Sequence, residues 1–442
     1  MGFEKEFKDY IENNLDECKK SAVKVKDYVA SSTAIYHGEP IKTLFIPKVF
    51  SKEAFSYMEK SAKTTCRILD KITDAYLKDS EYRKLFNFPK ELEELILIDR
   101  KYKTFIPMMR LDIFLNEEEL SFKYCEINTD GTSAMNEDFE LCKAFENNIA
   151  LDEFKKTHNI SQFELFNSWI DALLENYKDF SGTDEKPYVA ICDFLDCAYL
   201  ADFNRFESIF NQRGIECEIA EIRNLKYEDG VLYSPKGKKI DAIYRRAVTD
   251  DIFDHLDEVK DFIEAVKNKS VCLVGNFCTY IAHNKSLFNV IRNEKTKAIL
   301  TEEENSFVEE HFPLTGYLNS DNTQTELKLS DVLSSKDRWI IKPTNLYGAQ
   351  GIYVGSDFNQ EDWENKINEL KDSGYIFQEY CPPYRTENID LTEENPEYIG
   401  WINMSGMYMY NGELKGIFSR VAPDKVIAGH YGGRTLPSYR EL

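Results

Sequence analysis

Apolar residues recur every three or four positions through the first hundred residues, a spacing that predicts amphipathic helices. The pattern is clear over residues 3–11 and again over 55–62, where apolar side chains are set among charged ones. It stops near residue 105, and helical spacing resumes from about 136 to 178. We therefore expect a helical N-terminal region interrupted by a segment of another kind.

Between residues 105 and 128 the apolar positions follow a period of two, which predicts two strands around the polar loop 115–120. Alternate side chains of a strand face the same side, so Arg110 and Asp112 share one face, as do Glu126 and Asn128. With the loop centred near 117–118, Asp112 falls opposite roughly 124–126 and Arg110 opposite roughly 126–128. The four polar groups then converge on one patch, and the intervening apolar residues point away: Leu111, Ile113 and Ile127.

The patch has the chemistry of a metal site. Two carboxylates and an amide oxygen are hard donors that suit Mg²⁺, which usually binds waters and nucleotide phosphates as well. Arg110 beside them has a planar guanidinium that can hold a phosphoryl or carboxylate group through two hydrogen bonds. The same residues also fit a half-exposed hairpin with an ordinary polar face, and the hairpin alone leaves both interpretations open.

A polar, turn-rich segment at 181–186 precedes Pro187 and reads as a linker. Apolar runs near 188–192, 216–220 and 240–244, with a helical pattern over 204–213, then predict a small three-layer α/β domain at about 186–275. No G-x-G-x-x-G follows the first of these strands, so a dinucleotide site is not indicated.

A second candidate site lies in residues 339–355, where Lys342 ends a buried strand and a loop with Gly348 and Gly351 leads into another. Glycines allow close backbone approach to an anion, and Lys342 would supply positive charge to phosphates. The spacing matches neither a Walker A motif nor a kinase glycine loop, and it also fits a plain hairpin with a glycine turn.

Three further features carry two interpretations each. The strand 375–380 ends at prolines and offers a backbone edge that could read an adenine, or is simply a buried strand. Lys285 opens a helix, either toward a ligand or as a surface charge. From Lys415 to Leu442 five Lys and Arg stand against Asp424 and Glu441, which suits a cover over an anionic site or a solvated tail.

Composition narrows the class of partner. Lys and Arg number 55 against 78 Asp and Glu, a net charge of −23, which argues against nucleic acid and anionic membranes as partners. The N-terminus is charged at once and no apolar run approaches the roughly 20 residues of a spanning helix. The 10 cysteines and 6 histidines are dispersed, so we expect reduced thiols, no zinc site and a cytoplasmic protein.

In chain order, these residues resemble the ATP-grasp ligases, specifically the branch with eukaryotic-type glutathione synthetase and the synthetase domain of glutathionylspermidine synthetase. In that branch a hairpin of the form R-x-D…E-x-N lies early and the ATP-binding lysines lie late. This chain has the same order: Arg110-x-Asp112, Glu126-Ile-Asn128, Asn284-Lys285, Lys342-Pro with its glycine loop, and Gln378-Glu379.

Two other segments extend the resemblance, which runs from about residue 100 to the end. Residues 240–247 are similar to the family strand that delivers an arginine to the substrate. Ser419-Arg420-Val-Ala, followed by Gly429–Gly433, is similar to its basic C-terminal stretch and glycine loop.

The resemblance implies a role for each matched residue. Asp112, Glu126 and Asn128 would bind Mg²⁺, two ions in all, between the ATP phosphates. Lys285 and Lys342 would contact phosphates or adenine. Gly348 and Gly351 would lie in a loop over the phosphates, and the residues bordering adenine would be Phe377, Gln378 and Glu379.

The resemblance also implies substrate contacts. Arg110 would stabilise the transferring phosphoryl group, with Arg420 as a second catalytic residue. Arg246 and Arg420 would hold substrate carboxylates, and Ser133 would add a further substrate contact. One departure concerns the metal ligands: the glutathione synthetase loop carries a glutamate, whereas no acid lies between Lys342 and Gly351 here. The metals would then rest on the hairpin residues alone, as in the glutathionylspermidine branch, whose amidase domain has no counterpart in this chain.

The fold expected from the resemblance is an ATP-grasp fold of mixed α+β and α/β character. Residues 1–180 would be a helical region plus the metal-binding hairpin, 186–280 the α/β substrate domain, and 281–442 the nucleotide-binding region with a lid at about 330–385. The expected reaction joins a small-molecule carboxylate to an amine through an acyl-phosphate. A phosphotransferase on the same scaffold and a catalytically silent nucleotide-binding protein are the alternatives. The substrates and the oligomeric state are not determined by the sequence.

Overall fold

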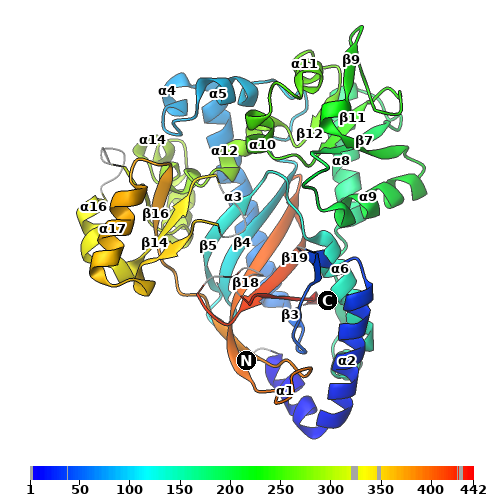
Figure 1. Cartoon of the computed structure of the whole chain (residues 1–442), viewed down its shortest axis with the longest axis vertical. Helices are drawn as coiled ribbons and strands as arrows, with labels where there is room; N and C mark the ends of the chain where they lie inside the picture. The colour runs from blue at the N-terminus through cyan, green and yellow to red at the C-terminus, as the bar shows by residue number, and fades with distance from the viewer. Residues whose placement is uncertain (1–2, 37, 320–326, 346–349, 426, 428–431) are drawn as a thin grey trace.

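The computed structural model describes residues 3–36, 38–319, 327–345, 350–425, 427 and 432–442. A long antiparallel sheet stands at the centre of the molecule, with a small antiparallel sheet on one side and a parallel sheet on the other (Figure 1). The mixed α/β architecture agrees with the fold class that the sequence predicts.

The N-terminal region is helical, as the spacing of its apolar residues predicts. Its longest helix, α3, begins after Ser51, whose Oγ accepts a hydrogen bond from Ala54 N at 3.1 Å. The buried face of α3, including Met58 and Ile72, packs against the central sheet. The elements of this region are α1 (Glu4–Asn13), α2 (Leu15–Ser31), β1 (Ile35–Tyr36), β2 (Glu39–Pro40), β3 (Lys48–Phe50), α3 (Lys52–Lys78), α4 (Ser80–Arg83) and α5 (Lys90–Ile96).

The central sheet joins two hairpins that are about 280 residues apart in the chain. Its order is β20-β19-β18-β4-β5, and β17 pairs with the opposite end of β18. The predicted early hairpin therefore lies beside strands from the C-terminal part of the chain. The strands are β4 (Met108–Asn116), β5 (Ser121–Asn128), β17 (Arg385–Asn388), β18 (Ile399–Tyr410), β19 (Glu413–Ala422) and β20 (Arg434–Leu436).

A three-stranded sheet ties together three distant parts of the chain. Its middle strand, β21 (Ser438–Glu441), is parallel to β3 and antiparallel to β6 (Ile160–Gln162). Helices α6 (Met135–Ala144) and α7 (Ile149–Thr157) connect the early hairpin to β6. The last described strand is thus inserted between two strands from the first half of the chain.

The predicted strand–helix alternation forms a parallel sheet of order β12-β11-β7-β8. Alternate residues of β7 enter two different apolar clusters: Val189 and Ile191 pack with Phe203 on one face, and Ala190 packs with Phe262 on the other. This confirms three layers. The elements are α8 (Phe166–Ser181), β7 (Val189–Asp193), α9 (Leu200–Gln212), β8 (Cys217–Glu221), β9 (Lys226–Glu228), β10 (Val231–Tyr233), β11 (Ala242–Arg245), α10 (Thr249–Asp254), α11 (Lys260–Lys267) and β12 (Cys272–Val274).

The four antiparallel strands of order β13-β16-β14-β15 form what we call the small sheet. Its outer face has a core of its own, built on Trp339, Trp363 and Phe377, all buried. The strands and their two helices are β13 (Thr315–Tyr317), α16 (Leu329–Ser334), β14 (Trp339–Pro343), β15 (Tyr353–Val354), α17 (Gln360–Leu370) and β16 (Tyr375–Glu379). Four helices lead into it: α12 (Tyr280–His283), α13 (Leu287–Val290), α14 (Glu294–Lys297) and α15 (Glu302–His311).

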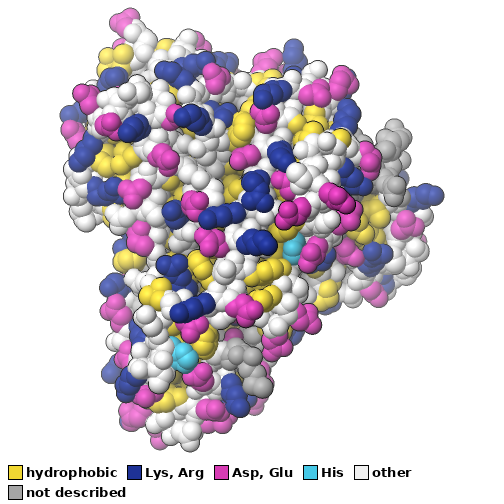
Figure 2. Space-filling model, turned by 180° about the vertical axis from the view of Figure 1, so that it is seen from behind, with side chains coloured by type: hydrophobic (Ala, Val, Ile, Leu, Met, Phe, Trp, Pro, Cys, Tyr) yellow, Lys and Arg dark blue, Asp and Glu magenta, His cyan; other side chains and the backbone are white. Residues whose placement is uncertain are grey.

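The surface and the thiols agree with the composition. On the face seen in Figure 2, basic and acidic side chains are intermingled. All ten cysteines are free and most are buried, which confirms the expectation of unpaired thiols. Within the described ranges, no helix combines the length and the apolar character that crossing a bilayer requires.

Candidate active site

The register of the early hairpin brings its four polar residues together. Arg110 lies opposite Asn128 and Asp112 opposite Glu126, with an irregularity in pairing directly after Asp112. The convergence that strand alternation predicts is therefore confirmed. The intervening apolar residues are buried in the cluster beneath the sheet: Leu111, Ile113 and Ile127.

Arg110 and Asp112 form a buried ion pair with two parallel hydrogen bonds. Arg110 Nε donates to Asp112 Oδ1 at 2.7 Å and Nη2 donates to Oδ2 at 2.8 Å. Asp112 is 0% exposed, and burial raises its pKa even though Arg110 opposes the shift. Arg110 Nη1 also donates to the Ser133 carbonyl oxygen at 3.1 Å, which fixes the guanidinium against the turn after the hairpin.

This close packing depends on Gly406 of β18, which lies opposite Asp112. A Cβ at Gly406 would come within 2.7 Å of Asp112 Oδ1 and 2.8 Å of Arg110 Cδ. The sequence interpretation missed this residue. Its signal was a glycine in the interior of a strand pattern, which often marks a close approach of another group.

Glu126 and Asn128 complete the patch. Asn128 Nδ2 donates to Asp112 Oδ2 at 3.1 Å and to Glu126 Oε1 at 3.2 Å, so three oxygen-bearing side chains meet at one point. Burial alone would raise the pKa of Glu126, but Lys285 and Arg110 lower it to about 2. Glu126 is therefore ionised at neutral pH.

The oxygen donors of this patch fit Mg²⁺ that also binds phosphates and waters better than they fit a metal ion held by protein side chains alone. Among the described residues, no three His, Cys, Asp or Glu side chains are grouped in a way that could hold a metal ion. Two carboxylates and one amide are nevertheless the ligand count that Mg²⁺ takes when substrate phosphates and waters fill its remaining positions.

Both predicted lysines lie near Glu126, although they are about 160 and 220 residues away in sequence. Lys342 Nζ, at the end of β14, donates to Gln378 Oε1 at 2.8 Å and to the Cys125 carbonyl oxygen at 3.3 Å. Burial lowers the pKa of Lys285, although Glu126 opposes the shift. Lys342 of the small sheet and Lys285 of the segment between α12 and α13 thus place two basic side chains near the acidic hairpin.

The residues predicted to border adenine do not share one face of the small sheet. Gln378 faces Lys342, whereas the Phe377 ring is 0% exposed and lies edge-on to Trp339 in the core of the opposite face. The period of two along β16 decides this, so Phe377 can reach a nucleotide only through its backbone. Glu379 accepts a hydrogen bond from Arg338 Nη2 at 3.1 Å.

Of the two predicted loop glycines, Gly351 belongs to the described residues and Gly348 does not. Gly351 has φ +67°, and a Cβ there would come within 2.9 Å of Tyr375 Oη, so both backbone and space require glycine. Gly348 lies outside the described residues, as does most of the C-terminal glycine segment, residues 428–431.

Two of the three proposed substrate residues, Ser133 and Arg420, interact with the Arg110–Asp112 pair. Arg246 is buried, donates from Nη1 to Tyr244 Oη at 2.9 Å, and has Nη2 3.8 Å from Asp202 Oδ2. Its Nε is buried without a hydrogen-bond partner among the described residues. Arg420, half-buried on β19, acts electrostatically on Asp112. The Ser133 side chain is exposed, and its carbonyl oxygen accepts from Tyr408 Oη at 2.5 Å as well as from Arg110.

The neighbouring Arg245 has a different position. Its Nη2 lies 2.5 Å from Asp130 Oδ1, and both side chains are 1% exposed. This pair joins the segment after the hairpin to the parallel sheet. Of two adjacent arginines, the first is thus bound in a structural ion pair and the second faces Tyr244 and Asp202.

Sequence reasoning also missed a carboxylate near the arginines. Burial and the nearby Asp202 raise the pKa of Glu137, on α6, while Arg420 and Arg110 oppose the shift. Nothing in the helical pattern of α6 distinguishes Glu137 from other acidic residues. The substrate end of the site therefore has buried groups of both signs.

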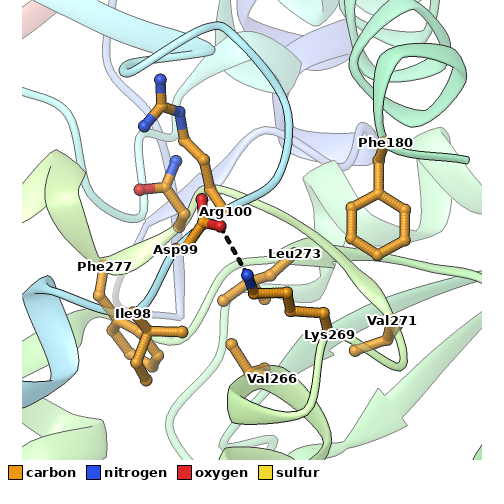
Figure 3. A pocket seen from close by; sticks show the side chains of 10 residues that line it. Ile98, Asp99, Arg100, Phe180, Val266, Lys269, Val271, Leu273 and Phe277 are labelled. Atoms are coloured by element: carbon orange, nitrogen blue, oxygen red, sulfur yellow. Dashed lines mark hydrogen bonds and ion pairs between the residues drawn. The ribbon is translucent and has the colours of Figure 1, made fainter.

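A small hollow away from these residues is closed by an ion pair. It lies among Ile98, Phe180 and Val266, with Lys269 Nζ 2.6 Å from Asp99 Oδ2 (Figure 3). Its volume of about 10 Å³ holds no more than about one water molecule. It is packing space and has no place in the site.

Comparison with known proteins supports the fold. No family model matches the chain. It is 22% identical over 165 residues to the ATP-grasp enzyme ankG of Aspergillus thermomutatus, a match that covers 36% of this chain and 34% of that protein. The chain thus spans about a third of that relative's length.

The structural match extends over nearly the whole chain. A glutathione synthetase-like effector, GSS30, from Globodera pallida has a TM-score of 0.59 at 13% identity, covering 96% of each chain. The fold of this chain is accordingly the ATP-grasp fold in its glutathione synthetase-like form.

Proposed function

We propose that this protein is an ATP-dependent ligase that joins a carboxylate to an amine. The observation that carries the proposal is the meeting of the Arg110–Asp112 pair, Glu126 and Asn128 with Lys285 and Lys342. Cations and metal-binding acids in one buried place suit a reaction in which a carboxylate must approach a triphosphate.

In this proposal the nucleotide lies between the hairpin and the inner face of the small sheet. Lys285 and Lys342 contact phosphates, Gln378 and Glu379 border the adenine, and Phe377 contributes its backbone. Gly348 and Gly351 belong to the loop over the phosphates. Asp112, Glu126 and Asn128 hold Mg²⁺, which supplies positive charge that offsets repulsion between the reacting anions.

The reaction proceeds in two steps. A carboxylate oxygen of the substrate attacks the γ-phosphorus of ATP, ADP leaves, and an acyl-phosphate forms. The amine nitrogen then attacks the acyl carbon, inorganic phosphate leaves with the bonding electrons, and the nitrogen loses a proton. Arg110 stabilises the transferring group, because its guanidinium is held rigidly by Asp112 and the Ser133 carbonyl oxygen.

The charges at the substrate end favour an amino acid or a peptide. Arg246 and Arg420 suit a carboxylate, and the buried carboxylates of Glu137 and Asp202 suit an ammonium group. A substrate with both charges would match these groups, with Ser133 at the edge of the site. The fold shared with a glutathione synthetase-like protein supports this class of substrate.

The test is ADP release from Mg-ATP by the purified protein across panels of carboxylates and amines, with products identified by mass spectrometry. Glu126→Gln is expected to slow ADP release roughly 100-fold or more, because it removes a negative charge from the metal site. Glu119→Gln is the control, since Glu119 is exposed in the loop of the same hairpin. Removal of Mg²⁺ with EDTA is expected to slow ADP release by the wild-type protein to the same extent as Glu126→Gln does.

Other results would contradict the proposal. A stable phosphorylated product without amide would identify a phosphotransferase. Nucleotide binding without ADP release on any substrate pair would identify a silent binding protein. Equal activity of Glu126→Gln and Glu119→Gln would remove the hairpin from the mechanism.

A further inference from the structure

A second hollow, larger than the one in Figure 3, lies beside the candidate active site and is separated from it by a wall of chain. Its volume is about 460 Å³, enough for a small organic molecule. Its walls come from the segment before α5, from α10 and α12, and from the small sheet. These elements are labelled in Figure 1, with β14 and β16 marking the small sheet. Its lining includes Phe86, Phe88, Asp250, Phe253, Asp254, Tyr280, Asn284, Ser286, Tyr317, Asn319, Thr344, Asp372 and Tyr375.

The wall consists of residues 284–286 and the end of β14. Asn284 and Ser286 line the cavity, and Lys285 between them interacts with Glu126 in the candidate active site. Lys285 N donates to the Thr344 carbonyl oxygen at 3.0 Å, which joins the two segments. A ligand in the cavity would therefore touch the back of the segment that carries Lys285, without entering the nucleotide site.

The charge of the cavity is negative. Three carboxylates line it, those of Asp250, Asp254 and Asp372, and none of its described lining residues is a lysine or arginine. Tyr280 Oη donates to Asp250 Oδ1 at 2.7 Å and accepts from Asn284 Nδ2 at 3.0 Å, so this carboxylate is held in a defined orientation. Burial, together with the neighbouring acids, raises the pKa of Asp250 to about 6, although the hydrogen bond from Tyr280 opposes the shift.

The remainder of the lining is aromatic. Phe86, Phe88, Phe253, Tyr317 and Tyr375 contribute rings, and Phe88 lies 5.3 Å from both Phe86 and Tyr280 between ring centroids. Aromatic faces beside carboxylates attract organic cations, by ring electrostatics and by charge. Two buried polar atoms of the lining residues, Ser286 Oγ and Asn319 Oδ1, have no hydrogen-bond partner in the described part of the chain.

We propose that this cavity is a binding site for a protonated amine that carries an apolar or aromatic body. The ammonium group lies among the three aspartates, the body packs on the rings, and a polar end meets Ser286 and Asn319. Binding there does not require ligase activity, so the site stands or falls independently of the proposed reaction. The amine is either the acceptor substrate waiting beside the site or an effector that is not consumed.

Occupancy would also affect the nucleotide. The cavity has walls from both the small sheet and the body of the protein, so a bound amine holds the two together. We therefore expect the amine to raise the affinity for Mg-ATP and, by linkage, Mg-ATP to raise the affinity for the amine by the same factor.

The first experiment measures binding by calorimetry without nucleotide. The probe is tyramine, which has an ammonium group, a ring and a hydroxyl. Its neutral analogue 4-ethylphenol is expected to bind about tenfold more weakly and the anion 3-(4-hydroxyphenyl)propionate more weakly still. Asp254→Asn is expected to weaken tyramine binding roughly fivefold, because Asp254 is exposed and its charge is screened.

Asp257→Asn is the matched control, since Asp257 is an exposed aspartate three residues further on that does not line the cavity. Equal binding of tyramine and 4-ethylphenol, equal loss in the two variants, or no binding of tyramine would each overturn the proposal.

A second experiment determines whether the bound amine is a substrate or an effector. With Mg-ATP and a carboxylate mixture, conversion of tyramine into an amide identifies an acceptor site. Unchanged tyramine with a shifted affinity for Mg-ATP identifies an effector site. A third result is tyramine that binds in calorimetry yet forms no amide and leaves the affinity for Mg-ATP unchanged in both the wild type and Asp254→Asn. That result would contradict the predicted coupling to the nucleotide.

Discussion

At the scale of single residues, the site depends on how closely three strands approach one another. Arg110 and Asp112 occupy one face of β4, and the adjacent β18 has no side chain at Gly406 where theirs must fit. The guanidinium is then fixed by two hydrogen bonds to Asp112 and one to Ser133. In the proposed reaction, a rigid arginine would lose little conformational freedom when it meets the transferring group, which favours catalysis.

Gly406→Ala is expected to displace the Arg110–Asp112 pair. The added Cβ would lie 2.7 Å from Asp112 Oδ1, so we expect a loss of about 1–3 kcal/mol in the free energy of unfolding and weaker Mg-ATP binding. Gly400→Ala, in the same strand, is the control, because its nearest atom would be 3.9 Å away. Urea denaturation of both variants measures the difference, and similar losses in both would show that the pair tolerates the methyl group.

At the scale of elements, helix ends and sheet faces place the functional groups. The α15 helix is capped by Thr301 in a reciprocal capping box. Glu304 N donates to Thr301 Oγ1 at 3.2 Å, and Thr301 N donates to Glu304 Oε2 at 2.8 Å. Lys71 of α3 donates to the same carboxylate at 2.6 Å. The cap therefore ties α15, which leads into the small sheet, to the longest helix of the N-terminal region.

This cap predicts a pH dependence of stability. Burial alone would raise the pKa of Glu304, but Lys71 and the Thr301 amide lower it. A lowered pKa in the folded state means that the stabilisation is present above the pKa of the unfolded chain and is lost as pH falls through the folded pKa. Glu304→Gln should cost about 1 kcal/mol at pH 7, with the difference shrinking in acid.

Glu303→Gln provides the comparison, since Glu303 is exposed in the same turn. Thermal denaturation from pH 7 to pH 3 measures both variants. A Glu304→Gln difference that stays constant across this range would contradict the ionised cap.

At the scale of the whole molecule, the chain is interlaced. The hairpin β4–β5 pairs with β18, and β21 lies between β3 and β6. Residues 1–180 and 281–442 therefore share two sheets, whereas the parallel sheet is formed within one continuous segment. The domain limits at 186 and 280 remain a prediction, and the strand pairing gives it a test.

A fragment of residues 281–442 is expected not to fold alone, because β18 would lose its partner β4 and β21 both of its neighbours. A fragment of residues 160–280, which keeps α8 to β12, should retain a cooperative transition. Circular dichroism during thermal unfolding distinguishes them. Cooperative unfolding of the first fragment, or none in the second, would show that the units are divided differently.

The sequence by itself determined the local parts of this protein. Alternation in two short runs was enough to predict Asp112 opposite roughly 124–126 and Arg110 opposite roughly 126–128, ranges that include the observed partners Glu126 and Asn128, because a hairpin loop of given length permits few pairings. The capping residues of α3 and α15 and the strands of the parallel sheet follow from equally local rules. The net charge described the exposed surface and argued against polyanionic partners, but it did not locate the site.

Only the tertiary structure decided how these parts combine. Lys285 and Lys342 lie near Glu126. Arg245 forms an ion pair with Asp130, whereas Arg246 faces Asp202. The side chains of Phe377 and Gln378 lie on opposite faces of the small sheet. The tertiary structure also required glycine at 406 and placed Glu137 near the arginines. These are contacts between separate segments of the chain or choices between two faces of one strand. Packing decides them, because local spacing fixes periodicity and leaves open which face meets which partner.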